Sequence, residues 1–385
     1  MAGESPFGTL SVDEFLRDHW QKKPLLVRGA FPDLNDPVSP EDLAGLAVEA
    51  PVESRLVLTE HEGVPFAVHY GPLEPGDFEN LPESDWTLLV RHVDKLVPEM
   101  GALLEHFRFM PDWRIDDIMV SYAVPGGSVG PHVDGYDVFL IQGMGRRRWQ
   151  INTGPDAPAT RREDTDLDVL AEFTPTEEWE LEPGDMLYLP PGVAHHGIAL
   201  EPGLTYSVGF RAPAQDELLA GWLEHLMKRA TGRERYRDPD LKAAEHPGKI
   251  GRETLDQVRK LLTEALDFDE TDFREWFGRF ITEDAGLPAP EPEPGRLGLE
   301  RLKRQLDAGK RLVRNPLSRV CYMENGDRAW LFVSGACYRT TLSLASRLGD
   351  QHTLGYQELR DTLKEPDDSS VVLELLNQGH WRLED

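Results

Sequence analysis

A histidine and an aspartate, separated by one residue, lie near the end of a glycine-rich stretch with the sequence GGSVGPHVDG at residues 126–135. If this stretch is extended, His132 and Asp134 point to the same face of a strand. Imidazole and carboxylate groups together bind transition metals such as Fe(II). The pair indicates part of a metal site, although a His-x-Asp pair alone is a weak signal that exposed loops also contain.

A second stretch, EPGDMLYLPPGVAHHG at residues 182–197, offers a third ligand. Its PGD turn opens a short apolar strand, and its PPG turn ends that strand just before His195 and His196. Because neighbours on a strand point to opposite faces, only one of the two histidines can face a shared metal. Two histidines and one carboxylate form the facial triad of non-haem Fe(II) oxygenases, which leaves three adjacent positions open.

The co-substrate that commonly fills two of these positions is 2-oxoglutarate. Its far carboxylate needs a cation, and a guanidinium can donate two parallel hydrogen bonds to a carboxylate. In the segment GRRRW, Arg147 shares a strand face with Trp149 and Ile151, so we expect it to point inward and its arginine neighbours to point to solvent. Ser121, on the preceding strand, is a candidate for a further hydrogen bond, with an ordinary strand serine as the plain alternative.

The elements that must position these groups are short strands. From about residue 52 to residue 213, apolar runs of three to five residues alternate with Gly and Pro turns, which indicates a β-sandwich or barrel. After Pro213 the apolar residues recur at helical spacing, as in Leu255, Val258 and Leu262. A proline-spaced acidic linker, PAPEPEP, then leads to a small α+β module.

The spacing Gly126-x5-His132-x-Asp134 resembles the first sequence box of the cupins, and Gly184-x5-Pro190-x-Gly192-x2-His195 resembles the second. This resemblance selects His195, and not His196, as the third ligand. The region up to residue 213 looks like a JmjC-domain 2-oxoglutarate oxygenase. The whole chain resembles the bacterial ribosomal oxygenases, which hydroxylate an arginine of large-subunit ribosomal protein number sixteen. The resemblance is carried by the stretches WRIDD, PGGSVGPHVD, GRRRW, PPGVAH and YSVGFRAP.

The resemblance implies a fold, a reaction and its cofactors. The expected fold is mainly β with α: a double-stranded β-helix oxygenase domain at residues 1–213, a helical dimerisation region at 214–286, a linker at 287–298 and a winged-helix-like domain at 299–385. The expected metal ligands are His132, Asp134 and His195, with Arg147 and Ser121 binding 2-oxoglutarate. Fe(II), 2-oxoglutarate and O2 are expected to serve a protein arginine hydroxylase that releases succinate and CO2. An arginyl substrate needs a carboxylate near the metal, and Asp116, Asp117 and Asp137 are candidates by their place in the sequence. The plain alternative for each is a surface carboxylate, so none of them is included in the expected site.

The net charge of the chain indicates which kinds of partner it can bind. The 69 Asp and Glu residues outnumber the 41 Lys and Arg residues, giving a formal charge of −28, which opposes binding to nucleic acid and suits either a basic partner or a salty environment. The chain has two cysteines, which indicates no disulfide framework. No long apolar run or signal peptide is evident, so we expect a cytoplasmic protein with no membrane association. The helices after Pro213 could either cap the β-core or form an oligomer interface, and the resemblance implies that they form a homodimer.

Three other readings remain open at this point. A transcription regulator could use the last module to bind DNA, but residues 356–385 contain eight acidic and three basic residues, which opposes contact with phosphates. A metal-binding cupin without oxygenase activity would keep the ligands and have no use for Arg147 as an anion contact. Demethylation shares the hydrogen-abstraction step with hydroxylation, and the sequence does not separate the two.

Overall fold

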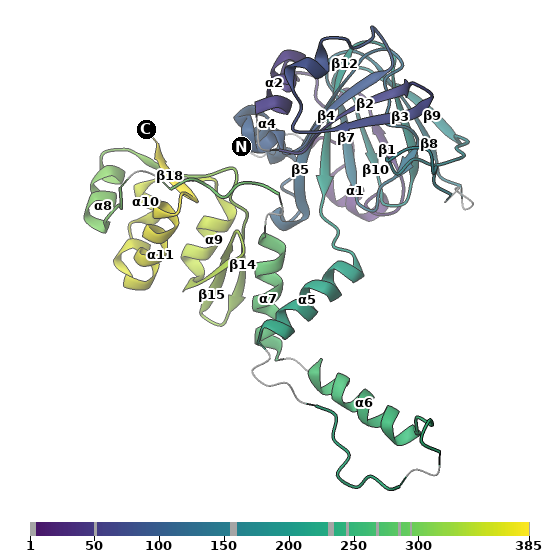
Figure 1. Ribbon diagram of the computed structural model, residues 1–385. Helices are drawn as coiled ribbons and strands as arrows, with labels where there is room; N and C mark the ends of the chain where they lie inside the picture. Colours follow the sequence, from purple (N-terminus) through teal and green to yellow (C-terminus); the bar gives the residue numbers. More distant parts are fainter. Residues whose placement is uncertain are drawn as a thin grey trace.

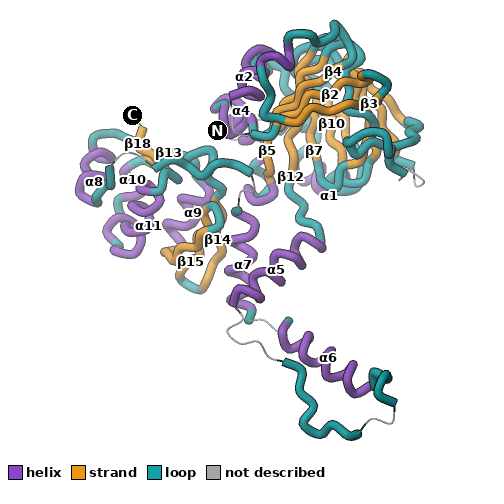
Figure 2. Tube along the Cα trace, viewed as in Figure 1, coloured by secondary structure: helices purple, strands orange, loops and turns teal. Residues whose placement is uncertain are grey.

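The structure is a computed structural model that describes residues 5–49, 52–154, 160–229, 235–243, 246–266, 269–283, 286–292 and 295–384. A β-rich domain is joined through a group of helices to a smaller α+β module that contains the C-terminus (Figure 1). Strands dominate the first part and helices dominate the middle (Figure 2). The predicted order of a β-core, helices and an α+β module is confirmed.

Two antiparallel sheets form the β-core. The first has the order β1-β10-β7-β12-β5-β4-β2-β3, and the second has the order β6-β11-β8-β9. The strands are β1 (Leu25–Val27), β2 (Ser54–His61), β3 (Val64–Tyr70), β4 (Trp86–Val90), β5 (Ile115–Ala123), β6 (His132–Val133), β7 (Val138–Gln142), β8 (Arg147–Asn152), β9 (Glu177–Leu181), β10 (Met186–Leu189), β11 (Ala194–Ala199) and β12 (Gly203–Phe210). The helices of this domain are α1 (Val12–Asp18), α2 (Pro40–Glu49), α3 (Val93–Leu96) and α4 (Pro98–Leu103).

Strand β7 explains how the two sheets are held together. All five of its residues are buried, and successive side chains point to opposite faces. Val138 and Leu140 join Trp149 of β8 in a cluster between the sheets. Phe139 and Ile141 join the larger core that includes Phe15 of α1. A strand that is buried at every position and apolar at its first four therefore fits a sheet that is covered on one face by the second sheet and on the other by helices.

The middle of the chain contains α5 (Gln215–Arg229), α6 (Arg252–Ala265) and α7 (Glu270–Thr282). Helices α5 and α7 pack through aromatic rings, with the centroids of Trp222 and Trp276 5.0 Å apart. Helix α6 extends away from the rest of the molecule (Figure 1) and contains no buried residue. Parts of the predicted helical region, residues 230–234, 244–245, 267–268 and 284–285, lie outside the described residues, as do residues 293 and 294 of the predicted linker.

The C-terminal module contains α8 (Leu299–Asp307), α9 (Leu342–Asp350), α10 (Tyr356–Leu359) and α11 (Pro366–Asn377). Its two three-stranded sheets have the orders β17-β13-β18 and β14-β15-β16. The strands are β13 (Arg311–Arg314), β14 (Val320–Asn325), β15 (Arg328–Val333), β16 (Ala336–Thr341), β17 (Thr353–Leu354) and β18 (Trp381–Glu384). Helix α7 packs on the second of these sheets, where an added Cβ at Gly278 would lie 2.3 Å from the Phe332 ring. The helical region is therefore anchored to the C-terminal module.

Among the described residues, no helix combines the length and the apolar character that crossing a lipid bilayer requires.

Candidate active site

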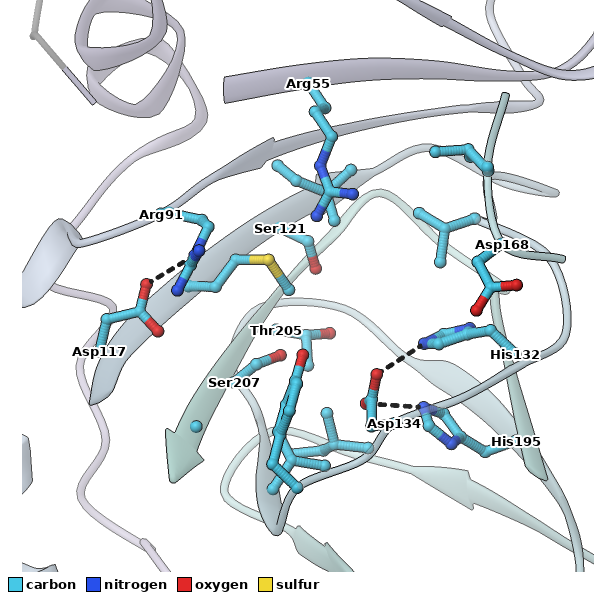
Figure 3. A pocket seen from close by; sticks show the side chains of 18 of the residues that line it. Arg55, Arg91, Asp117, Ser121, His132, Asp134, Asp168, His195, Thr205 and Ser207 are labelled. Atoms are coloured by element: carbon cyan, nitrogen blue, oxygen red, sulfur yellow. Dashed lines mark hydrogen bonds and ion pairs between the residues drawn. The ribbon is translucent and has the colours of Figure 1, made fainter. Parts of the chain in front are cut away.

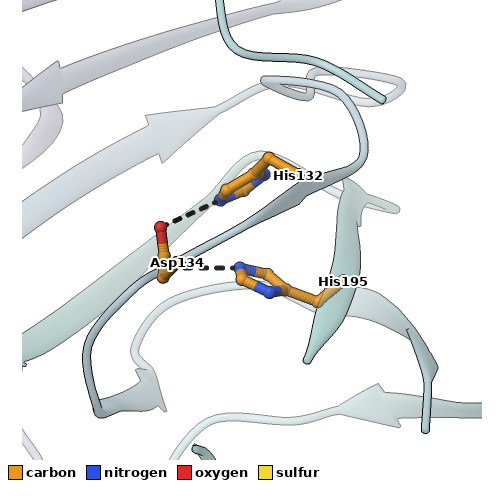
Figure 4. A group of neighbouring side chains, drawn as sticks. All are labelled: His132, Asp134 and His195. Carbon is orange, nitrogen blue, oxygen red and sulfur yellow. Dashed lines mark ion pairs between the residues drawn. The ribbon is translucent and has the colours of Figure 1, made fainter. Parts of the chain in front are cut away.

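Two histidines and an aspartate meet where β6 and β11 pair. His132 of β6 and His195 of β11 are direct neighbours in the antiparallel ladder, and Asp134 follows β6. The Asp134 carboxylate lies 3.9 Å from the Nε2 atom of His132 and 3.5 Å from the Nε2 atom of His195 (Figure 4). One ligand atom from each residue lies within 4.8 Å of the others, which is close enough for all three to bind one metal ion.

The hydrogen bonds of both histidines leave the correct nitrogen free for a metal. The Nδ1 atom of His132 lies 2.9 Å from the carbonyl oxygen of Gly130, and the Nδ1 atom of His195 lies 2.9 Å from that of Val193. A carbonyl oxygen only accepts, so each Nδ1 carries the proton and each Nε2 offers a lone pair. Burial, together with the nearby His132, lowers the pKa of His195 to about 4, so its imidazole is neutral at neutral pH, as a metal ligand must be.

His196 faces the other way, as the alternation of side chains on a strand requires. Its ring makes an edge contact with Phe173, with the centroids 6.0 Å apart, and it is not one of the three clustered ligands. The donor set of two imidazole nitrogens and one carboxylate thus suits Fe(II), with several positions left open for other ligands.

Arg147 lies inside the barrel on β8, whose residues alternate between buried and half-buried as the sequence predicts. Its guanidinium donates hydrogen bonds to the hydroxyls of Ser121, at 3.2 Å, and Thr205, at 3.4 Å, and it lies over the Trp149 ring. No carboxylate pairs with it among the described residues, and its Nε atom has no hydrogen-bond partner. Burial lowers the pKa of Arg147 to about 10. A buried cation without a counter-ion indicates a place for an anionic ligand.

Arg147 and the residues around its guanidinium, Ser121, Thr205 and Gly197, form what we call the cradle, and two of these residues, Thr205 and Gly197, were not predicted from the sequence. Thr205 of β12 is the direct partner of Ser121 in the ladder, so the two hydroxyls lie side by side. Gly197 leaves the room that Arg147 occupies, because an added Cβ would lie 2.8 Å from the Nε of Arg147 and 2.7 Å from the Trp149 ring. The alternation in the sequence GLTYSVGF could have placed Thr205 on one strand face, but its pairing with Ser121 depends on how β5 and β12 align.

A cavity of about 430 Å³ is lined by the three candidate ligands and by Arg147, Ser121 and Thr205. Figure 3 shows the candidate ligands, Ser121 and Thr205 around it. Its wall is formed by residues from both sheets and by the loop around residues 167–169. The charged members of the lining, apart from Asp134 and the cradle arginine, are Glu53, Arg55, Arg91, Asp116, Asp117 and Asp168. This volume is in the range of pockets that hold a small ligand together with part of a second substrate.

The three aspartates that were candidates for binding a cationic substrate have different surroundings. Asp137 is fully buried outside the cavity lining, where it accepts a hydrogen bond of 2.6 Å from the Tyr188 hydroxyl, so this candidate is wrong. Asp116 lines the cavity and is engaged by arginines on both carboxylate oxygens. Asp117 also lines the cavity; its Oδ2 atom accepts from Arg91 at 3.1 Å. Burial raises the pKa of Asp117, and the Arg91 cation opposes this shift.

Comparisons with known proteins agree with this geometry. A family model described as a JmjC domain matches residues 102–218, and a ROXA-like winged helix matches residues 262–382. The ribosomal protein uL16 3-hydroxylase of Escherichia coli is 38% identical over 98% of both chains. A probable ribosomal oxygenase of Haemophilus influenzae is 38% identical over 68% of this chain and 65% of that protein.

Solved structures extend the likeness to three dimensions. The X-ray structure of E. coli YcfD superposes with a TM-score of 0.86 at 38% identity and covers 98% of this chain and 99% of that one. The E. coli ribosomal oxygenase YcfD in complex with cobalt and 2-oxoglutarate gives a TM-score of 0.82 at 37% identity, with the same coverage of both chains. With both domains matched and almost the whole chain aligned, the chain belongs to the family of JmjC-domain ribosomal oxygenases.

Proposed function

We propose that this chain hydroxylates an arginine side chain of the large-subunit ribosomal protein uL16, with Fe(II), 2-oxoglutarate and O2. The observation that carries the proposal is the placement of two unlike features on one cavity: a free triad of metal-binding atoms and a buried, unpaired guanidinium. A metal-binding protein without oxygenase activity has no need for the second feature. The likeness to the E. coli uL16 3-hydroxylase favours the ribosomal substrate.

In this proposal His132, Asp134 and His195 hold the iron through their Nε2 and carboxylate atoms. Bound there with 2-oxoglutarate and O2, the iron supplies the oxidation that replaces a C–H hydrogen by a hydroxyl group, while 2-oxoglutarate is converted to succinate and CO2. Arg147 and Ser121, with Thr205, bind the far carboxylate of 2-oxoglutarate in a place that water reaches poorly. A charge-assisted pair is strengthened by such burial, so the cradle orients the keto acid toward the metal.

The substrate guanidinium needs an acidic contact, and Asp117 offers one. Its Oδ2 atom is held by Arg91 and by the backbone N–H of His92, each at 3.1 Å. Its Oδ1 atom has no hydrogen bond among the described residues and lies at the cavity wall beside Gly209. A guanidinium that pairs with Oδ1 would favour the ionised form of this carboxyl and would be held at the entrance to the metal site.

Tandem mass spectrometry of ribosomal proteins tests the proposal. In the organism that encodes this chain, deletion of the gene should remove a single-oxygen addition from one arginine of uL16, and the wild type should restore it. The His132→Ala variant should not restore it, whereas the matched control His196→Ala should, because His196 faces away from the cluster. An unchanged uL16 in the deletion strain would refute the ribosomal assignment and leave the metal site to be tested separately.

We further propose that α5 and α6 form the interface of a homodimer. Exposed apolar side chains follow one face of α6, with Leu255, Val258 and Leu262 at 56%, 39% and 61% exposure. Isolated helices of this length are marginal in water, so a helix without a buried residue needs a partner to cover its apolar face. Light scattering on the wild type and on Leu255→Glu/Leu262→Glu should give masses of a dimer and a monomer; a monomeric wild type would refute the interface.

We propose that the C-terminal module contacts protein and does not read DNA, and that the enzyme works in the cytoplasm, where ribosomes are assembled. Helix α11 begins with Asp367 and Asp368 in its first turn and has no basic residue in its last turn. Such a helix repels phosphates. The domain boundaries that we propose are residues 1–213, 214–286, 287–298 and 299–385, with α7 docked on the last domain.

A further inference from the structure

We propose that Arg319, a residue of the C-terminal module, is a positioning residue for the acidic wall of the catalytic cavity. This inference rests on the proposed function, because it assigns Arg319 a part in binding the basic substrate. Arg319 directly precedes β14 and is more than 200 residues away in sequence from the start of β5, which it contacts. It holds Asp116, and through Asp116 and Arg91 it fixes the carboxylate of Asp117 that faces the cavity.

In the β-core, Arg319 contacts the first two residues of β5. Its guanidinium donates to the carbonyl oxygen of Ile115 at 3.3 Å, to the carbonyl oxygen of Asp116 at 3.1 Å and to the Oδ1 atom of Asp116 at 2.8 Å. The side chain is 11% exposed, so the ion pair is mostly protected from solvent screening. A planar guanidinium can satisfy several acceptors in a fixed geometry, which a single ammonium group cannot reproduce.

Asp116 connects Arg319 to the cavity through Arg91. The Oδ1 atom of Asp116 faces Arg319 and, at 3.6 Å, Arg211, whereas its Oδ2 atom accepts from Arg91 at 2.9 Å. Burial alone would raise the pKa of Asp116, but Arg319, Arg91 and Arg211 together lower it, so this carboxylate is ionised. Asp116 therefore contacts three cations, and two of them, Arg91 and Arg211, also contact another group.

Arg91 also contacts Asp117. Its Nε atom donates to the Oδ2 atom of Asp117 at 3.1 Å (Figure 3). Its Nη2 atom donates to the Oδ2 atom of Asp116 at 2.9 Å. If Arg319 is removed, one oxygen of Asp116 loses its closest cation, and the carboxylate is free to turn toward Arg91. Arg91 would then be drawn away from Asp117, whose Oδ1 atom would lose its fixed direction toward the cavity.

The same region ties the cavity to the helices. Arg211, which follows β12, also donates to the carbonyl oxygen of Ile281 in α7 at 2.6 Å. Helix α7 in turn packs on the sheet that contains β14. The acidic wall of the cavity is thus braced by Arg319, which belongs to the C-terminal module, and by Arg211, which contacts α7. This gives the docked module a role in substrate binding that does not require it to touch the substrate.

Steady-state kinetics on the full-length protein test this role. We expect Arg319→Ala to raise the KM for recombinant uL16 by about tenfold, the lower end of what losing hydrogen bonds to a charged group costs. The dissociation constant of 2-oxoglutarate, measured on the Mn(II)-loaded protein, should change less than about twofold, because Arg147 and Thr205 lie on β8 and β12 and Ser121 lies five residues beyond Asp116 on β5. Arg319→Lys should lie between Arg319→Ala and the wild type, because it keeps the charge and loses the fork.

Arg328→Ala is the matched control. Arg328 belongs to the same module, is 46% exposed and pairs with Asp367 at 3.0 Å inside that module. We expect its KM for uL16 to equal that of the wild type. If Arg328→Ala and Arg319→Ala have the same KM, or if Arg319→Ala lowers only the thermal midpoint, the positioning role is refuted and Arg319 only stabilises the docking of the domains.

A readout without uL16 separates this inference from the proposed function. If the wild type does not hydroxylate uL16, the proposed function fails, and a crystal structure of Arg319→Ala still decides the positioning role. The expected result is an Arg91 side chain that has left Asp117 and moved toward Asp116. An unchanged hydrogen bond between Arg91 and Asp117 in that structure would overturn the inference.

Discussion

Replacing Arg147 by methionine should affect ligand binding and folding stability in opposite directions. Burial lowers the pKa of Arg147 to about 10. Because the charged form is penalised in the folded state, this penalty is fully present below pH 10 and is lost only at more alkaline pH. A pKa lowered by more than two pH units, at about 1.4 kcal/mol each, corresponds to a cost on the order of 3 kcal/mol at neutral pH.

Removing the cation should therefore raise the free energy of unfolding of the ligand-free protein, by between zero and about 3 kcal/mol, because the hydrogen bonds to Ser121 and Thr205 and the contact with Trp149 are lost at the same time. Binding of 2-oxoglutarate should weaken strongly. Truncating one partner of a buried, hydrogen-bonded charge pair costs about 2–5 kcal/mol, which corresponds to a roughly 30-fold to several-thousand-fold higher dissociation constant.

The assays are urea unfolding of the ligand-free protein and isothermal titration calorimetry of 2-oxoglutarate into the Mn(II)-loaded protein without oxygen. Arg148→Met is the matched control, because Arg148 is the next residue on the same strand and pairs on the outer face with Glu180 at 3.1 Å. It should leave the affinity unchanged. The reasoning would be refuted if Arg147→Met bound 2-oxoglutarate within about threefold of the wild type, since a lost charge pair of even 1.4 kcal/mol costs tenfold.

Three further outcomes follow from particular contacts. Thr205→Val should weaken 2-oxoglutarate binding by about 3- to 10-fold in the same calorimetric assay, because the hydroxyl that accepts a hydrogen bond from Arg147 and orients its guanidinium is lost. In urea unfolding, Gly278→Ala should lower the free energy of unfolding by about 1–3 kcal/mol, because the new methyl group overlaps the Phe332 ring. Gly45→Ala should raise the free energy of unfolding by about 0.5–1 kcal/mol, because Gly45 lies in α2 with open space around it. Burial raises the pKa of the Cys321 thiol to about 12. Iodoacetamide should therefore alkylate Cys321 slowly at pH 8, and the rate should rise steeply only toward pH 12. Rapid alkylation of Cys321 in the native protein at pH 8 would contradict this burial.

The sequence alone determined the parts of this site that depend on local geometry. The alternation of side chains on a strand placed His132 and Asp134 on one face, turned His196 away from His195 and pointed Arg147 inward with Trp149. These inferences need only the period of two within one strand. The change from short strands to helical spacing near residue 213 likewise predicted where the β-core ends.

Elements with mixed composition were not predicted. Strands β13, with the sequence RLVR, and β16, with ACYRTT, contain arginines and little apolar sequence, so neither carries a strand signal by itself. Both form because neighbouring strands in the C-terminal module complete their hydrogen bonds, which is a tertiary effect that local propensity does not contain.

Only the tertiary structure decided which groups complete the site. Thr205 joins Ser121 because β12 aligns with β5 in one register, and Gly197 matters because Arg147 crosses directly over it. Asp117 of β5 lines the cavity, whereas Asp137, which directly precedes β7, is buried outside the cavity lining, although both were candidates by their place in the sequence. Arg319 reaches Asp116 from another domain. Local sequence fixes the direction of a side chain along its own strand, whereas contacts between distant segments depend on register and domain docking, which arise only when the whole chain packs.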